Sequence, residues 1–86
     1  MQRFIENYIQ KISKQDILSF AYQNNLSLSK EEIDILYHYL LNNYKDLLNG
    51  NSRGIFEALE DKIDSDKLDK IKELYEFYYN KYQDLL

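Results

Sequence analysis

The chain has 86 residues, a net charge of −4, no cysteine and a single histidine, His38. These numbers exclude disulfides, thiolate zinc sites and paired-histidine metal sites, so we predict no metal and no cofactor. Nucleic-acid binding usually relies on a concentrated basic face, which the charge balance disfavours. No apolar run approaches the roughly 18 residues that span a bilayer, and the N-terminus lacks a signal-peptide core. We therefore expect a soluble cytoplasmic protein without a membrane partner.

The fold class follows from the spacing of apolar residues. There is no proline and there are only two glycines, and apolar residues recur every three or four positions. This pattern predicts an all-α protein, a compact bundle of about five helices, with residues 1–86 forming a single domain.

The first two helices are predicted over residues 2–12 and from Ser13 to Asn24–Asn25. One side of the first helix is apolar, with Phe4, Ile5, Tyr8, Ile9 and Ile12. Ser13 and Asp16 have the spacing of a capping box, and asparagine tolerates the left-handed conformation that ends a helix. The second helix is apolar over about 200° of its surface, so we expect neighbouring helices to clamp it.

The third helix follows a short extended link in which Leu26 and Leu28 should point inward and Ser27 outward. Ser29 and Glu32 form a second predicted capping box, and the Asn49–Gly50 pair supplies the stop. The main apolar stripe of this helix consists of Ile33, Leu36, Tyr37, Leu40, Tyr44 and Leu47.

The fourth helix is predicted over residues 53–63, and the fifth from about Asp66 to near the C-terminus. Asn51 or Ser52 is the candidate cap of the fourth helix, and the "DSD" of residues 64–66 separates the two helices. We expect the long third and fifth helices to pack against each other, with the three shorter helices covering them.

The fifth helix carries a stripe with alternating spacings of three and four, typical of a helix-packing seam. Its members are Leu68, Ile71, Tyr75, Tyr78, Tyr82 and Leu85. The exposed residues flanking it are mostly acidic, which disfavours stacking of these rings on nucleic acid. We therefore interpret the rings as packing within the bundle or between copies, with Phe77 alone clearly off the stripe.

Four apolar residues are the candidate partner surface: Ile35, Tyr39, Phe77 and Tyr79. Ile35 and Tyr39 lie off the main stripe of their helix, four positions apart. Nine tyrosines are more than so small a core can enclose, and tyrosine is enriched at interfaces. This excess predicts a non-enzymatic protein–protein interaction domain, whose partner is another protein or a second copy in a homodimer.

No residue set predicts catalysis. His38 falls on the polar side of its helix, where Asp34 is its natural contact. The acidic residues around "DKIDSDKLD" lack the glycine and terminal glutamate of a calcium loop, and lysines separate them. The "NGNSRG" of residues 49–54 lacks the lysine of a phosphate loop, and we expect Arg53 to meet acids on the last helix.

Two alternative functions remain open. Residues 14–48 form a helix, link and helix, the order found in nucleic-acid-binding regulators. The second of these helices, however, begins with Glu31, Glu32 and Asp34, where a DNA-reading helix presents basic or amide side chains. The other alternative is an acidic inhibitor of a nucleic-acid enzyme, which would need a continuous carboxylate face.

The segments "ISKQDILSFAYQNNLSLSKEEIDILYHYLL" and "IFEALEDKI", between a leading amphipathic helix and a last helix, resemble a family of short proteins from low-GC Gram-positive bacteria. This family is known as domain of unknown function 2624. The resemblance covers nearly the whole chain, and the tyrosine-rich end departs from it. It implies an all-helical fold and a bacterial, cytoplasmic setting, and no catalytic residues.

Overall fold

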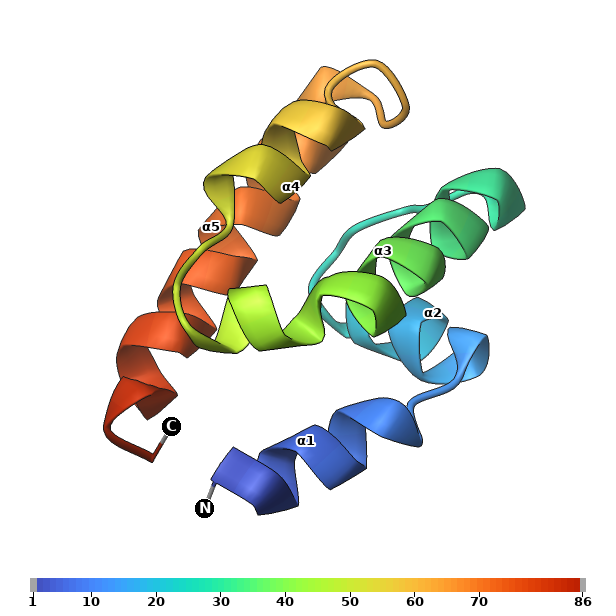
Figure 1. Ribbon diagram of the computed structural model, residues 1–86. Helices are drawn as coiled ribbons and strands as arrows, with labels where there is room; N and C mark the ends of the chain where they lie inside the picture. Colours follow the sequence, from blue (N-terminus) through green and yellow to red (C-terminus); the bar gives the residue numbers. More distant parts are fainter. Residues whose placement is uncertain (1, 86) are drawn as a thin grey trace.

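The computed structural model describes the backbone of residues 2–85 and the side chains of residues 5–84, so the predicted packing of Phe4 and Leu85 lies outside the described side chains. This part of the chain is an all-α bundle of five helices, as predicted (Figure 1). The helices are α1 (Gln2–Gln10), α2 (Lys14–Gln23), α3 (Lys30–Leu48), α4 (Arg53–Leu59) and α5 (Ser65–Tyr82), followed by the 3-10 helix η1 (Gln83–Leu85).

Both predicted capping boxes are present. The Ser13 hydroxyl accepts from the Asp16 amide at 3.1 Å, and the Asp16 carboxylate accepts from the Ser13 amide at 2.8 Å. Ser29 and Glu32 make the same reciprocal pair at the start of α3, at 3.1 and 2.8 Å. Each box satisfies two amides near the helix start that have no intrahelical partner, so α2 and α3 begin where their sequence predicts.

The predicted C-terminal ends of α2 and α3 are also confirmed. Asn25 adopts φ of 59°, and the Leu26 amide donates to the Ala21 carbonyl at 2.8 Å. At the end of α3, Gly50 has φ of 81°, and the Asn51 amide donates to the Asp46 carbonyl at 2.8 Å. Both are Schellman-type ends, in which a left-handed residue reverses the chain and satisfies the last carbonyls.

Three boundaries differ from the prediction. α1 ends at Gln10, and α4 ends at Leu59, because the amides that follow each helix bond mostly three residues back and tighten the chain into turns. α5 starts one residue earlier than predicted. Its cap is Asp64, whose carboxylate accepts from the Lys67 amide at 3.3 Å. Ser52 occupies the cap position of α4 without making a side-chain capping bond.

The main core lies where α4, the N-terminal half of α5 and the N-terminal half of α3 meet. Its buried members are Phe56, Leu59, Ile63 and Leu68. Half-buried side chains of α3 pack against them, namely Ile35, Leu36 and Tyr39. The chain between α4 and α5 turns back so that Ile63 fills this core at 3% exposure.

α3 and α5 do not form the predicted spine of closely packed helices, although side chains join them at Glu32 with Lys67 and at Tyr75 with Leu47. The close helix pairs are α1 with α3, α2 with α3, and α4 with α5 (Figure 1). α3 kinks at Asn43, whose φ is −135° and whose side-chain amide donates to the Tyr39 carbonyl at 2.9 Å. The side-chain amides of Asn42 and Asn43 both donate to carbonyls of the previous turn, a pattern associated with bent helices. The helix that packs closely on α5 is α4.

The predicted clamping of α2 is met only in part. Ala21 is buried at 2% exposure, Leu18 and Phe20 are about two-fifths exposed, and Tyr22 is 83% exposed. α2 packs closely against α3, and Phe20 also contacts Tyr78 of α5, whereas the side of α2 that carries Tyr22 has the least cover.

Candidate protein-binding surface

An exposed aromatic cluster joins α2 to the C-terminal half of α5. The Phe20 ring lies 5.6 Å from the Tyr78 ring, and Tyr78 stacks on Tyr82 at 6.3 Å with planes 5° apart. Phe77 meets Tyr78 edge to face at 5.1 Å. Phe77 is 59% exposed, and Phe20 and Tyr82 are each 41% exposed. We call these four residues the aromatic surface.

Among the described residues, one cation, Lys81, lies over the aromatic surface. The Lys81 amine is 5.9 Å from the centre of the Phe77 ring and 5.4 Å from that of Tyr82. Such cation–π contacts at exposed sites contribute about 0.5–1 kcal/mol each. Lys81 therefore helps to order rings that water otherwise surrounds.

The other two tyrosines of α5 have different surroundings. The Tyr75 hydroxyl donates to the Leu47 carbonyl at 2.6 Å, and its ring lies 5.8 Å from Phe56. Burial of this phenol raises the pKa of Tyr75 above its ordinary value. Tyr79 stacks on Tyr75 at 5.9 Å, and its hydroxyl lies over Gly50, where a Cβ would come within 2.8 Å of it. Tyr75 and Tyr79 thus hold α5 to the end of α3.

The four residues predicted as a partner surface fall in three places. Ile35 and Tyr39 are half-buried against the core and line a shallow groove of about 390 Å³ with Asp34, His38 and Lys62. Tyr79 lies half-buried over Gly50. Phe77 belongs to the aromatic surface. The four residues therefore share no single face. A position off the main apolar stripe of a helix does not keep a side chain exposed, because a neighbouring helix can cover it.

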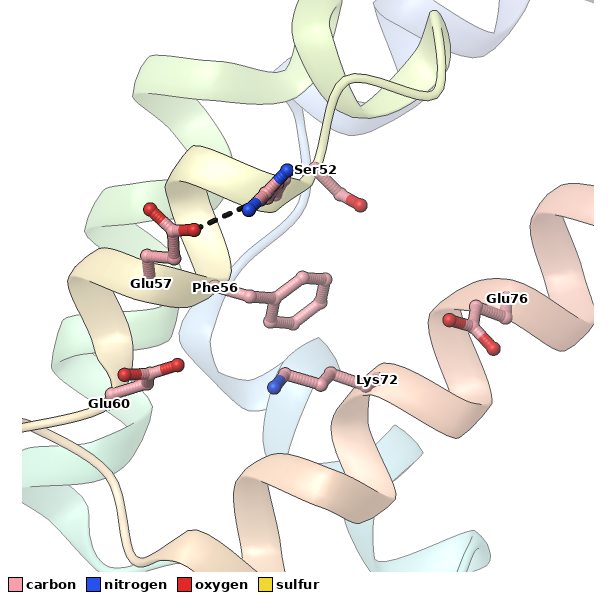
Figure 2. A pocket seen from close by; sticks show the side chains of 7 residues that line it. Ser52, Phe56, Glu57, Glu60, Lys72 and Glu76 are labelled. Atoms are coloured by element: carbon pink, nitrogen blue, oxygen red, sulfur yellow. Dashed lines mark hydrogen bonds and ion pairs between the residues drawn. The ribbon is translucent and has the colours of Figure 1, made fainter.

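A second groove, of about 320 Å³, runs between α4 and α5. Figure 2 shows the Phe56 ring at its floor, with Glu57 and Glu60 on one wall and Lys72 on the other. The Lys72 amine lies 5.9 Å from the ring centre. Arg53 pairs with Glu57 of its own helix at 3.1 Å, so the prediction that it meets acids on the last helix is wrong. Charges of both signs line this groove, which is therefore the solvated edge of the core.

His38 and its neighbours form a solvated set of polar contacts. His38 is exposed, and its ring nitrogens lie 3.2 and 3.3 Å from the Asn42 side-chain amide. Asp34 instead pairs with Lys14 of α2 at 3.0 Å. Within residues 5–84, no three histidine, cysteine or carboxylate side chains gather as metal ligands would.

The least exposed ion pair of the described residues joins α3 to α5. The Lys67 amine donates to the Glu32 carboxylate at 2.8 Å, and the Glu32 side chain is 12% exposed. Burial by itself would raise the pKa of Glu32. The hydrogen bonds from Lys67 and Ser29, with the attraction of the Lys67 charge, outweigh burial and lower that pKa overall.

Sequence reasoning placed Phe77 at the surface but missed that Phe20 and Tyr82 are exposed beside it. Tyr78 and Tyr82 lie on the apolar stripe of α5, and the stripe by itself predicts packing. Phe20 belongs to a helix apolar over more of its circumference than one neighbour can cover, and this excess was the available signal.

No family model, curated protein or solved structure matches the chain. The resemblance to domain of unknown function 2624 therefore stays a prediction. None of the helices among the described residues is long and apolar enough to cross a membrane.

Proposed function

We propose that this chain is a non-enzymatic protein-interaction domain that binds its partner through the aromatic surface. The observation that carries the proposal is the exposure of Phe20, Phe77 and Tyr82 in one contiguous cluster. Fully burying a phenylalanine side chain contributes about 1.5–3 kcal/mol, and folding leaves much of this unrealised here. A partner that covers the rings would gain it.

The positions of the rings also favour binding. They project from helices and contact one another and the Lys81 amine, and such contacts are expected to limit their rotamers. Binding then costs less side-chain entropy than it would for rings on a mobile loop. Aromatic side chains on such surfaces are the usual energetic centres of protein interfaces.

No specific observation favours either alternative function, the nucleic-acid-binding regulator or the acidic inhibitor of a nucleic-acid enzyme. The carboxylates at the start of α3 are engaged within the molecule, Glu32 with Lys67 and Asp34 with Lys14. These pairs interrupt the continuous acidic face that an inhibitor of a nucleic-acid enzyme would need.

The test is site-specific photocrosslinking in the native host. Replacing Phe77 or Phe20 with p-benzoylphenylalanine keeps an aromatic ring at each position and adds a photoreactive ketone. We expect covalent adducts with a protein from both positions, identified by mass spectrometry. The matched control is Tyr22, which is more exposed than either but lies outside the aromatic surface, and which should give none.

Adducts from Tyr22 equal to those from Phe77 and Phe20, or no adducts at any position, would contradict the proposal. Because the chain has a mass of 10.5 kDa, the mass of an adduct also separates a second copy from another protein.

A further inference from the structure

The outer face of α5, continued by η1, carries a stripe of exposed residues that shares Phe77 with the aromatic surface. Centred on Phe77, its members are Lys70, Glu73, Phe77, Lys81 and Asp84, spaced by three, four, four and three positions. At about 100° per residue, all five lie within roughly 40° of the direction of Phe77. We call these five residues the α5 stripe. It faces solvent along nearly the full helix. Asp66 lies in the same direction about 16.5 Å from Phe77, beyond the stretch that two stripes centred on Phe77 would share.

The charges of the α5 stripe are arranged as a self-complementary sequence. From Lys70 to Asp84 the side chains are basic, acidic, aromatic, basic and acidic. Read in the opposite direction, every basic position becomes acidic and every acidic position becomes basic. Two such stripes in antiparallel orientation, with Phe77 facing Phe77, would set Glu73 opposite Lys81. The same alignment would set Lys70 opposite Asp84. A parallel pair would set like charges opposite each other, which is repulsive.

The distances suit this arrangement. With a rise of about 1.5 Å per residue, Glu73 and Lys81 lie about 6 Å on either side of Phe77 along the helix. Lys70 lies about 10.5 Å before Phe77, and Asp84, which belongs to η1, lies at a similar distance after it. At interaxial separations of about 8–10 Å, facing long side chains reach one another.

None of the four charged side chains forms an ion pair with another described side chain. Lys81 lies over the Phe77 and Tyr82 rings, and in the proposed pairing its amine would turn from them to a facing carboxylate.

We propose that the partner is a second copy of the chain, bound by antiparallel pairing of the two α5 stripes about a two-fold axis beside Phe77. This inference rests on the proposed function, of whose aromatic surface it uses Phe77 as the centre of the interface, and it names the partner. One helix face from each copy makes a small interface. Interfaces below about 1,200 Å² are typically weak or transient, so the dimer should form at micromolar or higher concentration.

Sedimentation equilibrium of the full chain tests the pairing through its charges. Wild type should show a monomer–dimer equilibrium that weakens as salt rises, because exposed ion pairs are screened. Glu73→Lys and Lys81→Glu should each weaken dimerisation about tenfold or more, since each places like charges opposite in two symmetric pairs.

Mixing these two variants is the decisive measurement. In the heterodimer, Lys at position 73 of one copy faces Glu at position 81 of the other, and the remaining pair is native. An equimolar mixture should therefore dimerise about as well as wild type, and so should the double variant Glu73→Lys/Lys81→Glu. The matched control is Glu76→Lys, the same charge change at an exposed position of α5 outside the stripe, which should not weaken the dimer.

A wild type that stays monomeric at millimolar concentration would overturn the inference, as would a dimer that the single charge variants leave intact or that mixing fails to restore. In those cases, photocrosslinks from Phe77 and Phe20 to a different protein would still support the proposed function, whereas absence of all crosslinks would overturn both. Circular dichroism of each variant confirms that helix content is unchanged.

Discussion

The two halves of α5 have the same apolar spacing and opposite surroundings. In the first half, Leu68 is 3% exposed beneath α4 and α3. In the second half, Tyr82 lies on the same stripe and is 41% exposed. A packing stripe therefore identifies which face of a helix seeks a neighbour, and says nothing about how far along the helix a neighbour extends.

Helix length explains the difference. α5 has 18 residues and α4 has 7, so at about 1.5 Å per residue α4 covers less than half of α5. The rest of α5 is joined to the kinked end of α3 at Tyr75 and Tyr79, and to Phe20 of α2 at Tyr78.

The largest expected effect is in the covered half. Leu59→Ala removes a side chain that is 2% exposed and leaves a cavity among Phe56, Ile63 and Leu68. It should lower the free energy of unfolding by about 2–5 kcal/mol, a large share of the stability of so small a domain. Urea denaturation followed by circular dichroism measures this change. A loss below 1 kcal/mol would show that the core is less tightly packed than the structure indicates.

The ion pair between Glu32 of α3 and Lys67 of α5 should be lost in acid. Because the pKa of Glu32 is lowered on folding, its contribution is complete above the unfolded pKa of about 4.3 and disappears as pH falls through the folded pKa. Glu32→Gln should cost about 1–2 kcal/mol at pH 7, through a charge-assisted hydrogen bond and a weakened cap.

Urea midpoints of wild type and Glu32→Gln measured between pH 7 and pH 2 check this effect. The two proteins should converge at the acidic end. A constant difference across this range would mean that the carboxylate charge contributes nothing.

Tyr75 lies at the boundary between the two halves. Tyr75→Phe removes its hydrogen bond to the Leu47 carbonyl and should cost about 0.5–1.5 kcal/mol. Because the pKa of Tyr75 is raised on folding, the stabilisation is complete below the unfolded pKa of about 10 and is lost as pH rises through the folded pKa. Thermal melts of both proteins from pH 8 to 11.5 should show that wild type is more stable than Tyr75→Phe at pH 8 and that this difference disappears as pH rises. Equal stability at pH 8 would argue against the hydrogen bond.

The smallest effect is expected in the uncovered half. Phe77→Ala should change the stability of the monomer by no more than about 0.5 kcal/mol, because 59% of the side chain already contacts water. Denaturation at a concentration well below that of dimerisation measures the monomer alone. A loss comparable to that of Leu59→Ala would show that the two halves of α5 are equally covered and would remove the basis of the proposed interface.

Local chemistry was sufficient to predict the helices. Ser13, Ser29, Asn25 and Gly50 begin or end their helices through bonds to residues three to five positions away, so their spacing in the chain determines the outcome. The solvated state of His38 and the separation of Leu26, Ser27 and Leu28 between inside and outside follow from periodicity in the same way.

The sequence by itself thus determined the all-α class, the capping boxes of α2 and α3 and the apolar face of each helix, because these depend on interactions within a few residues. Only the tertiary structure decided that α4 packs closely on α5, and that Phe20, Tyr78 and Tyr82 meet at the surface. Those outcomes depend on contacts between residues tens of positions apart. Several helices carry similar apolar stripes, so the stripes alone leave open which pairs form, and packing in three dimensions selects among them.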